Sequence, residues 1–159
     1  RVGLDGKTFT MFKFRTMHVD AEAMKASLTE ANEADASAGN SVMFKMANDP
    51  RITRIGALLR KTSIDELPQL FNVLRGDMSL VGPRPPLPSE VAQYEPRVMG
   101  KFAVRPGITG LWQISGRSNL SWDETVHLDL SYAQHRSLTL DAWIMLQTIP
   151  ALLRHEGAY

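Results

Sequence analysis

The sequence has 159 residues, of which 43% are hydrophobic and 22% are charged, and its formal net charge is +1. These values are typical of one globular domain with a core of its own, and they argue against global disorder. The near-zero charge without a basic stripe argues against a nucleic-acid binder. The chain has no cysteine, which excludes disulfides, thiolate metal sites and thiol catalysis. No apolar run reaches the length of a membrane span.

Residues 1–17 are expected to form a β-hairpin. Asp5-Gly6 is a hairpin-turn dipeptide, and residues 8–14 are rich in Phe and Thr, which favours a strand. After this hairpin, Asp20 can cap a short, weakly apolar helix that stops by Gly39.

Two helices and a short strand are expected in the middle of the chain. Asp49-Pro50 combines a helix cap with a first-turn proline, and apolar residues follow at helical spacing over 52–59. A second apolar stripe over residues 67–74 is closed by Gly76. Residues 78–81 are expected to form a short strand before a proline-rich turn.

The last third of the chain is expected to be helical after an ordered loop over residues 104–118. Ser121-Trp122-Asp123-Glu124 is a capping box, which predicts a helix from residue 122 to 135. A final helix is expected over residues 140–154, with a kink at Pro150. Its large apolar surface suits either a core helix or a helix at a membrane interface.

Asp65 and Glu66 are the first candidate site. An ionised aspartate near a helix start and near arginines can attack phosphorus and form an acyl phosphate. Glu66 could help to bind a divalent cation, which prefers oxygen ligands. The acids also complete a capping-box pattern that begins at Ser63, so a purely structural role stays open.

Basic residues in three further segments are candidate phosphate contacts. Arg84 stands between prolines, so a stiff backbone presents a guanidinium that matches phosphate oxygens. Arg105 and Arg117 flank a glycine-rich loop and could hold anionic oxygens. Lys13 and Arg15 project from one side of the expected strand. The structural alternatives are a rigid surface turn, a packed loop and a charged strand edge, in that order.

These segments occur in one order along the chain, and together they resemble the bacterial sugar transferases, also called monotopic phosphoglycosyl transferases. The resemblance covers about residues 7–159 and is specific because five modest motifs follow one another. The motifs are Lys13-Phe14-Arg15-Thr16-Met17, Asp49-Pro50-Arg51-Ile52-Thr53, Thr62-Ser63-Ile64-Asp65-Glu66-Leu67-Pro68-Gln69, Gly76-Asp77-Met78-Ser79-Leu80-Val81-Gly82-Pro83-Arg84-Pro85 and residues 105–117.

The resemblance implies a mechanism and a cofactor. Asp65 matches the family's nucleophile, which would attack the sugar-linked phosphate of a UDP-sugar, release UMP and pass the phosphosugar to polyprenyl phosphate. Glu66 matches the second acid of the catalytic pair, and Asp65 and Glu66 are the expected ligands of Mg²⁺. The expected substrate contacts, all basic, are Arg60, Arg84, Lys13, Arg15, Arg105 and Arg117.

The resemblance also implies a fold and a location. We expect one α+β domain over residues 1–159, mostly helical, with a small antiparallel sheet built on a β-hairpin. The nearest subgroup is the undecaprenyl-phosphate glucose or galactose phosphate transferases of exopolysaccharide and O-antigen pathways. The catalytic domain is expected on the cytosolic side of the bacterial inner membrane. The chain begins at Arg1 rather than Met, so we expect the family's re-entrant membrane segment to precede it.

The expected partners are a UDP-sugar donor, a polyprenyl phosphate acceptor and the membrane surface, with no nucleic acid. A homo-oligomer is compatible with the sequence, and the identity of the sugar is left open. The alternative function is a membrane-associated interaction module that keeps the fold without catalysis. The presence of Asp65, Glu66 and Arg84 argues against that alternative.

Overall fold

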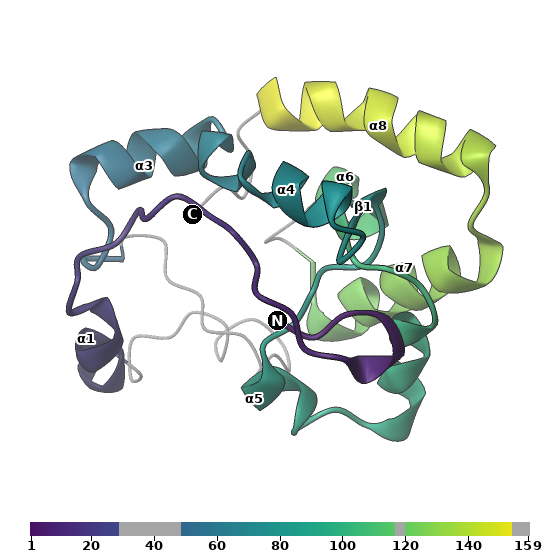
Figure 1. Cartoon of the computed structure of the whole chain (residues 1–159), viewed down its shortest axis with the longest axis horizontal. Coiled ribbons are helices and arrows are strands. Elements are labelled where there is room, and N and C mark those ends of the chain that lie inside the picture. Colours follow the sequence, from purple (N-terminus) through teal and green to yellow (C-terminus); the bar gives the residue numbers. More distant parts are fainter. Residues whose placement is uncertain (29–48, 117–119, 154–159) are drawn as a thin grey trace.

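The part of the chain that the structure describes is mainly helical, with a two-stranded parallel sheet (Figure 1). A computed structural model describes residues 1–28, 49–116 and 120–153. In chain order the elements are η1 (Leu4–Gly6), α1 (Ala21–Ser27), α3 (Arg54–Lys61), η3 (Ile64–Glu66), α4 (Gln69–Leu74), β1 (Ser79–Val81), α5 (Pro88–Val91), η4 (Pro96–Ala103), β2 (Gly107–Thr109), α6 (Leu111–Ile114), α7 (Trp122–His135) and α8 (Leu138–Leu153). The expectation of a mostly helical domain is confirmed. Gly39 and the loop around it lie outside the described residues.

The sheet is parallel, so the expected antiparallel, hairpin-based sheet is wrong. Strand β1 pairs with β2 in the register Ser79 with Gly107 and Val81 with Thr109. The two strands are separated by α5 and η4, a crossover that a parallel pair requires. A Cβ atom on Gly107 would collide with the backbone nitrogen of Gly82. Glycine in this loop therefore serves the close approach of two backbone segments.

The expected hairpin exists only as a tight turn. Asp5 and Gly6 have φ values of 55° and 73°, the positive values that a primed hairpin turn requires. Val2 and Thr8 form an isolated antiparallel bridge across this turn. Arg1 and Phe9 extend this pairing with two backbone hydrogen bonds of 2.8 Å, and beyond Phe9 the chain finds other partners.

Asn72 takes the place of a partner strand for the segment after Thr8. The fully buried Asn72 side chain accepts a hydrogen bond from the Phe12 amide at 2.9 Å. It also donates to the Thr10 carbonyl at 2.7 Å. Buried backbone groups need partners, and here an amide side chain from α4 supplies them. The segment stays extended without becoming a strand.

Helix α3 begins four residues later than predicted. Thr53 is its N-cap, and the Thr53 hydroxyl accepts a hydrogen bond from the Gly56 amide at 2.9 Å. The predicted cap, Asp49, instead holds the guanidinium of Arg51 with contacts of 2.6 to 3.1 Å. Asp49 also accepts a hydrogen bond from the Arg51 backbone amide at 3.0 Å, so it closes a local turn where Pro50 was expected to open a helix.

Helix α7 begins at the predicted capping box, where Ser121 and Glu124 bond each other's backbone amides. Helix α7 and α8 pack on the sheet, and the buried core joins Val81, Tyr132 and Ile144. The Tyr132 hydroxyl lies 2.7 Å from the Asp141 carboxylate, which ties α7 to α8.

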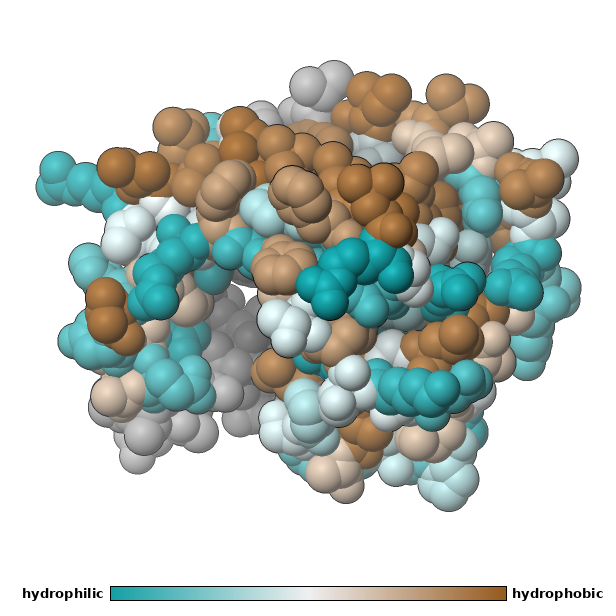
Figure 2. Space-filling view, viewed as in Figure 1, coloured by the Kyte–Doolittle hydropathy of each residue, from teal (hydrophilic) through white to brown (hydrophobic). Residues whose placement is uncertain are grey.

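Helices α3, α4 and α8 lie along one edge of the molecule, at the top of Figure 1. The same edge is strongly hydrophobic in the space-filling view (Figure 2). Its exposed apolar side chains are Ile55, Leu58, Leu70, Phe71, Leu74, Trp143, Leu146 and Ile149, which we call the apolar edge. Among the described residues, no helix is both long enough and apolar enough to cross a membrane.

Candidate active site

A cavity of about 460 Å³ opens beside η3 and collects most of the predicted site residues. Two carboxylates and four basic side chains line it, together with polar and apolar groups from the β2–α6 loop and α8. The charged lining residues are Asp65, Glu66, Arg1, Lys13, Arg60 and Arg84. The cavity is therefore a predominantly cationic space with two acids at one position.

Asp65 sits in the single 3-10 turn of η3 rather than in a capping box. Ser63, just before η3, has a left-handed backbone with φ of 56° and makes no side-chain cap. Such strained conformations of non-glycine residues cluster at functional sites. The side chain of Asp65 is 2% exposed, and its Oδ2 atom lies 2.9 Å from Lys13 Nζ. The contact is an ion pair without hydrogen-bond geometry.

Backbone pairing places Lys13 beside this carboxylate. The Phe14 amide donates a hydrogen bond of 3.0 Å to the carbonyl of Asp65. This bond joins two segments that lie far apart in the sequence and sets Lys13 Nζ between the acids. The same nitrogen lies 3.1 Å from Oε1 of Glu66.

Asp65 and Glu66 can share one cation, since both reach the same ammonium group of Lys13. The described residues contain no cluster of three metal-ligating side chains. Two carboxylates without a protein cage fit Mg²⁺, which keeps several waters and takes further ligands from substrate phosphates. This pair of carboxylates is thus compatible with Mg²⁺, the cofactor expected from the resemblance.

Arg60 and Arg84 reach the cavity from different parts of the chain. Arg60, in the last turn of α3, donates to the hydroxyl of the buried Thr16 at 2.9 Å. Burial lowers the pKa of Arg60, and the charge of Asp65 opposes that shift. Arg84 donates to Glu90 at 3.1 and 3.4 Å, which fixes its guanidinium at the cavity wall.

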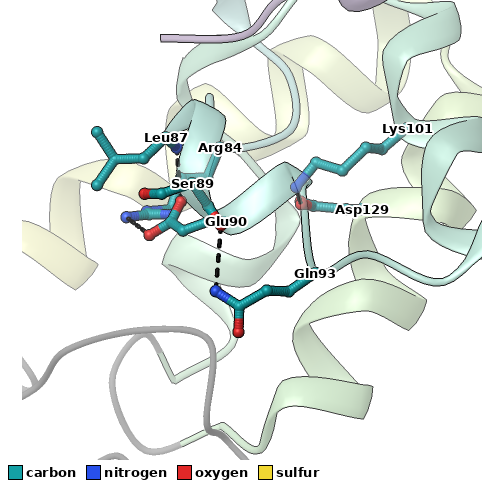
Figure 3. A network of polar contacts seen from close by, with 7 residues as sticks. All are labelled: Arg84, Leu87, Ser89, Glu90, Gln93, Lys101 and Asp129. Atoms are coloured by element: carbon teal, nitrogen blue, oxygen red, sulfur yellow. Dashed lines mark hydrogen bonds and ion pairs between the residues drawn. The ribbon is translucent and has the colours of Figure 1, made fainter.

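Figure 3 shows a network of polar contacts that includes Arg84, Glu90, Lys101 and Asp129. The Glu90 carboxylate accepts from the Leu87 amide at 2.6 Å as well as from Arg84. Lys101 of η4 and Asp129 of α7 form a buried ion pair at 2.5 Å. Burial raises the pKa of Asp129, whereas Lys101 and the backbone amide of Arg84 act to lower it. Sequence patterns gave no signal for this pair.

Three of the predicted substrate-binding residues are not among the described residues that line the cavity. Arg15 is exposed and is not among the cavity-lining residues. Arg105 is exposed and donates to the Gly76 carbonyl at 2.9 Å, beside a separate hollow. Arg117 lies outside the described residues.

Several lining residues were not expected from the sequence. Arg1 belongs to no motif. Thr148 and Leu152 come from α8, whose sequence indicated only a generally apolar helix. Trp112 belongs to the glycine-rich loop, and its indole Nε1 is buried without a hydrogen-bond partner among the described residues. Buried polar groups are normally paired, so this donor is a signal that only the structure gives.

The arrangement is suited to chemistry on a phosphate. A carboxylate is held beside cations that can neutralise an incoming anion, and phosphoryl transfer depends mainly on such positioning and electrostatics. Neither thiol nor histidine lines the cavity in the part of the chain that the structure describes. Asp65 is thus a buried carboxylate that faces a cationic space.

The chain belongs to the bacterial sugar transferase family, whose sequence pattern matches residues 1–155. It is 46% identical over 159 residues to an undecaprenyl-phosphate galactose phosphotransferase of Salmonella typhimurium, covering 100% of this chain and 33% of that protein. It is 43% identical to an exopolysaccharide production protein of Rhizobium meliloti, covering 100% of this chain and 70% of the relative.

A third relative is a UDP-glucose:undecaprenyl-phosphate glucose-1-phosphate transferase of Caulobacter vibrioides. It is 41% identical over 169 residues, which cover 100% of this chain and 57% of the relative. The chain spans about a third of the length of several relatives, the Salmonella protein among them. The activities of those longer proteins are therefore a basis for a proposal about this chain.

Proposed function

We propose that this chain catalyses transfer of a hexose 1-phosphate from a UDP-sugar to polyprenyl phosphate, the first step of exopolysaccharide or O-antigen type assembly. The observation that carries the proposal is Asp65, a carboxylate 2% exposed on a cavity with four basic side chains. The names of the relatives from Salmonella and Caulobacter agree with this substrate class.

The reaction proceeds in two displacements at one phosphorus atom. An Asp65 oxygen attacks the sugar-linked phosphorus, and the bond from that phosphorus to the bridging oxygen breaks, so UMP leaves with the bonding electrons. The phosphosugar is then held as an acyl phosphate. An oxygen of polyprenyl phosphate attacks the same phosphorus and releases the Asp65 carboxylate. Covalent catalysis of this kind divides one difficult transfer into two easier ones.

The basic residues make these encounters between anions feasible. Lys13 lies between Asp65 and Glu66, and Arg60 and Arg84 hold the walls of the cavity. Guanidinium groups match phosphate oxygens and keep their charge at all physiological pH values. Asp65 and Glu66 are the proposed holders of Mg²⁺, which would neutralise phosphate charge when bound.

The apolar edge is the proposed membrane-facing surface. Leu67 and Leu70 line the cavity and are also 54% and 45% exposed, so the cavity adjoins the apolar edge. A contiguous exposed apolar surface marks an interaction site, and Trp143 is of the type that prefers membrane interfaces. This placement would bring the cavity to the level of the acceptor's phosphate, on the cytosolic side of the bacterial inner membrane.

Intact-mass analysis tests the covalent step. The protein is incubated with Mg²⁺ and each member of a panel of UDP-sugars, and we expect a phosphohexose adduct together with released UMP. Asp65→Asn should give neither the adduct nor UMP. Turnover in Asp65→Asn equal to wild type would exclude the covalent route, and the sugar that gives the adduct would identify the donor.

Vesicle flotation tests the membrane surface separately. Phe71→Ser combined with Ile149→Ser should reduce binding to vesicles of anionic and zwitterionic phospholipids. Val19→Ser is the control, because Val19 is 88% exposed and directly precedes α1, which lies apart from α4 and α8 in Figure 1. Vesicle binding without any UMP release would favour the interaction module over the enzyme.

A further inference from the structure

Among the described residues, Arg1 is the one charged cavity residue that neither a motif nor the family resemblance assigned. Its side chain lines the cavity with Glu66 and Arg84. Its Nη1 atom is buried and has no hydrogen-bond partner among the described residues. A buried donor that is left unpaired carries a free-energy penalty, so a group of this kind calls for an explanation.

The backbone holds Arg1 against the segment that carries Arg84. The Val2 amide donates a hydrogen bond of 3.0 Å to the Pro86 carbonyl. On the other side, the Phe9 amide donates to the Arg1 carbonyl at 2.8 Å. Pro86 is fully buried, and prolines stiffen the segment that contains Arg84. The two guanidiniums are therefore mounted on one rigid frame.

This placement is unfavourable without a ligand. Burial lowers the pKa of Arg1, and the charge of Arg84 lowers it further, while Glu90 and Glu66 oppose the shift. Glu90 is already hydrogen-bonded to Arg84 and to the Leu87 amide. An anion between the two guanidiniums would relieve their repulsion and would also give Arg1 Nη1 an acceptor.

We infer that Arg1 and Arg84 together form a binding position for one phosphate group of a substrate. The inference rests on the proposed function and adds Arg1 to its substrate-binding residues. Two sources of phosphate are chemically equivalent here, the diphosphate of the nucleotide sugar and the phosphate of the lipid acceptor. Guanidinium groups bind both through the same paired hydrogen bonds.

The test compares Arg1→Gln, Arg1→Lys and Lys7→Gln in the full chain. Lys7→Gln is the matched control, since it removes one charge from the same turn at an exposed residue that does not line the cavity. Thermal unfolding first establishes that all three variants fold. Formation of the Asp65 adduct and transfer to a short polyprenyl phosphate are then measured separately.

If Arg1 binds the donor, Arg1→Gln should raise the KM for UDP-sugar in adduct formation by about ten- to a hundredfold, the loss typical of a charge-assisted hydrogen bond. If it binds the acceptor, the adduct forms normally and the KM for polyprenyl phosphate rises instead. In either case Arg1→Lys should recover part of the loss, because it restores the charge without the planar fork.

The inference is overturned if Arg1→Gln changes neither KM more than Lys7→Gln does. Equilibrium binding of UDP and of short polyprenyl phosphate separates this failure from failure of the proposed function. If wild type releases no UMP, the proposed reaction is wrong. Weaker binding of UDP or of short polyprenyl phosphate by Arg1→Gln than by Lys7→Gln would then still support the phosphate position, and equal binding of both ligands would overturn it.

Discussion

Asp65 and Asp129 have the same exposed fraction, 2%, and each forms an ion pair with a lysine. Their surroundings differ. Lys13, the partner of Asp65, is 34% exposed and lines the cavity with Glu66. Lys101, the partner of Asp129, is 6% exposed and is enclosed where η4 packs against α7. One pair faces a space for a ligand, and the other is enclosed by protein.

The comparison shows that burial and pairing do not by themselves mark a reactive carboxylate. A nucleophile needs a partner that can move or be replaced when substrate arrives, and a half-exposed lysine beside a cavity allows this. A lysine enclosed with its acid cannot leave without exposing a buried charge to an apolar environment. Asp65 is thus suited to chemistry, whereas Asp129 is suited to holding α7 and the Arg84 segment in place.

The largest expected effect is loss of activity in Asp65→Asn. We expect UMP release to fall by about four orders of magnitude or more, the scale seen when a nucleophile is removed. The free energy of unfolding should change by less than about 1 kcal/mol, because Lys13 can be hydrated once its acid is neutral. UMP assays and urea unfolding measure the two quantities. An equal fall of activity in Asp129→Asn, at unchanged stability, would contradict the comparison.

Lys101→Met should have the opposite effect, a large loss of stability with a smaller change in activity. It leaves Asp129 buried without its cation, and breaking a buried pair costs about 3–5 kcal/mol in the free energy of unfolding. The double variant Lys101→Met with Asp129→Leu should recover most of this loss, since two apolar side chains can replace a buried pair. Urea unfolding of the three proteins measures the recovery.

The pH dependence of Lys101→Met gives a further check with a defined sign. Burial raises the folded-state pKa of Asp129, so the folded protein binds the proton more tightly than the unfolded chain does. Stability should therefore fall as pH rises from the ordinary aspartate pKa towards the raised one. The double variant lacks the carboxyl and should not show this component. A rise in the stability of Lys101→Met over the same range would contradict the assignment.

Local signals explain which parts of the fold were predictable. The Ser121 to Glu124 capping box involves residues three apart, and it located the start of α7 correctly. Pairing of β1 with β2 was not predictable, because it depends on two glycine-containing segments meeting after a long crossover. Residues 8–14 have strand composition, but the partner they find is the side chain of Asn72. No pattern in the sequence indicates that partner.

The site residues likewise divide into those that sequence motifs predicted and those that only the structure shows. The motifs named Asp65, Glu66, Lys13, Arg60 and Arg84, and these five residues do line one cavity. The contributions of Arg1, Trp112 and Thr148 depend on how distant segments pack, and a sequence pattern does not contain that information.

Lys13→Gln tests the comparison of the two ion pairs by changing a lysine instead of an aspartate. We expect UMP release to fall by about a hundredfold, the scale for loss of one charge-stabilising group at a reacting centre. Stability should change by less than about 1 kcal/mol, since the partly exposed Lys13 contributes little through its ion pairs. Lys101→Met, by contrast, should mainly change stability. If Lys13→Gln destabilises the protein as much as Lys101→Met does, the two pairs are equivalent and the distinction fails.

The smallest expected effect is that of Ser121→Ala at the start of α7, the helix that carries Asp129. Loss of an N-cap costs about 1 kcal/mol, because an amide in the first turn loses its acceptor. The cap lies outside the cavity, so UMP release per folded molecule should be unchanged while urea unfolding shifts to lower concentration. A fall in UMP release as large as that of Lys13→Gln would mean that modest destabilisation of α7 reaches the site. In that case the enclosed Asp129 pair would influence Arg84 and the reaction itself.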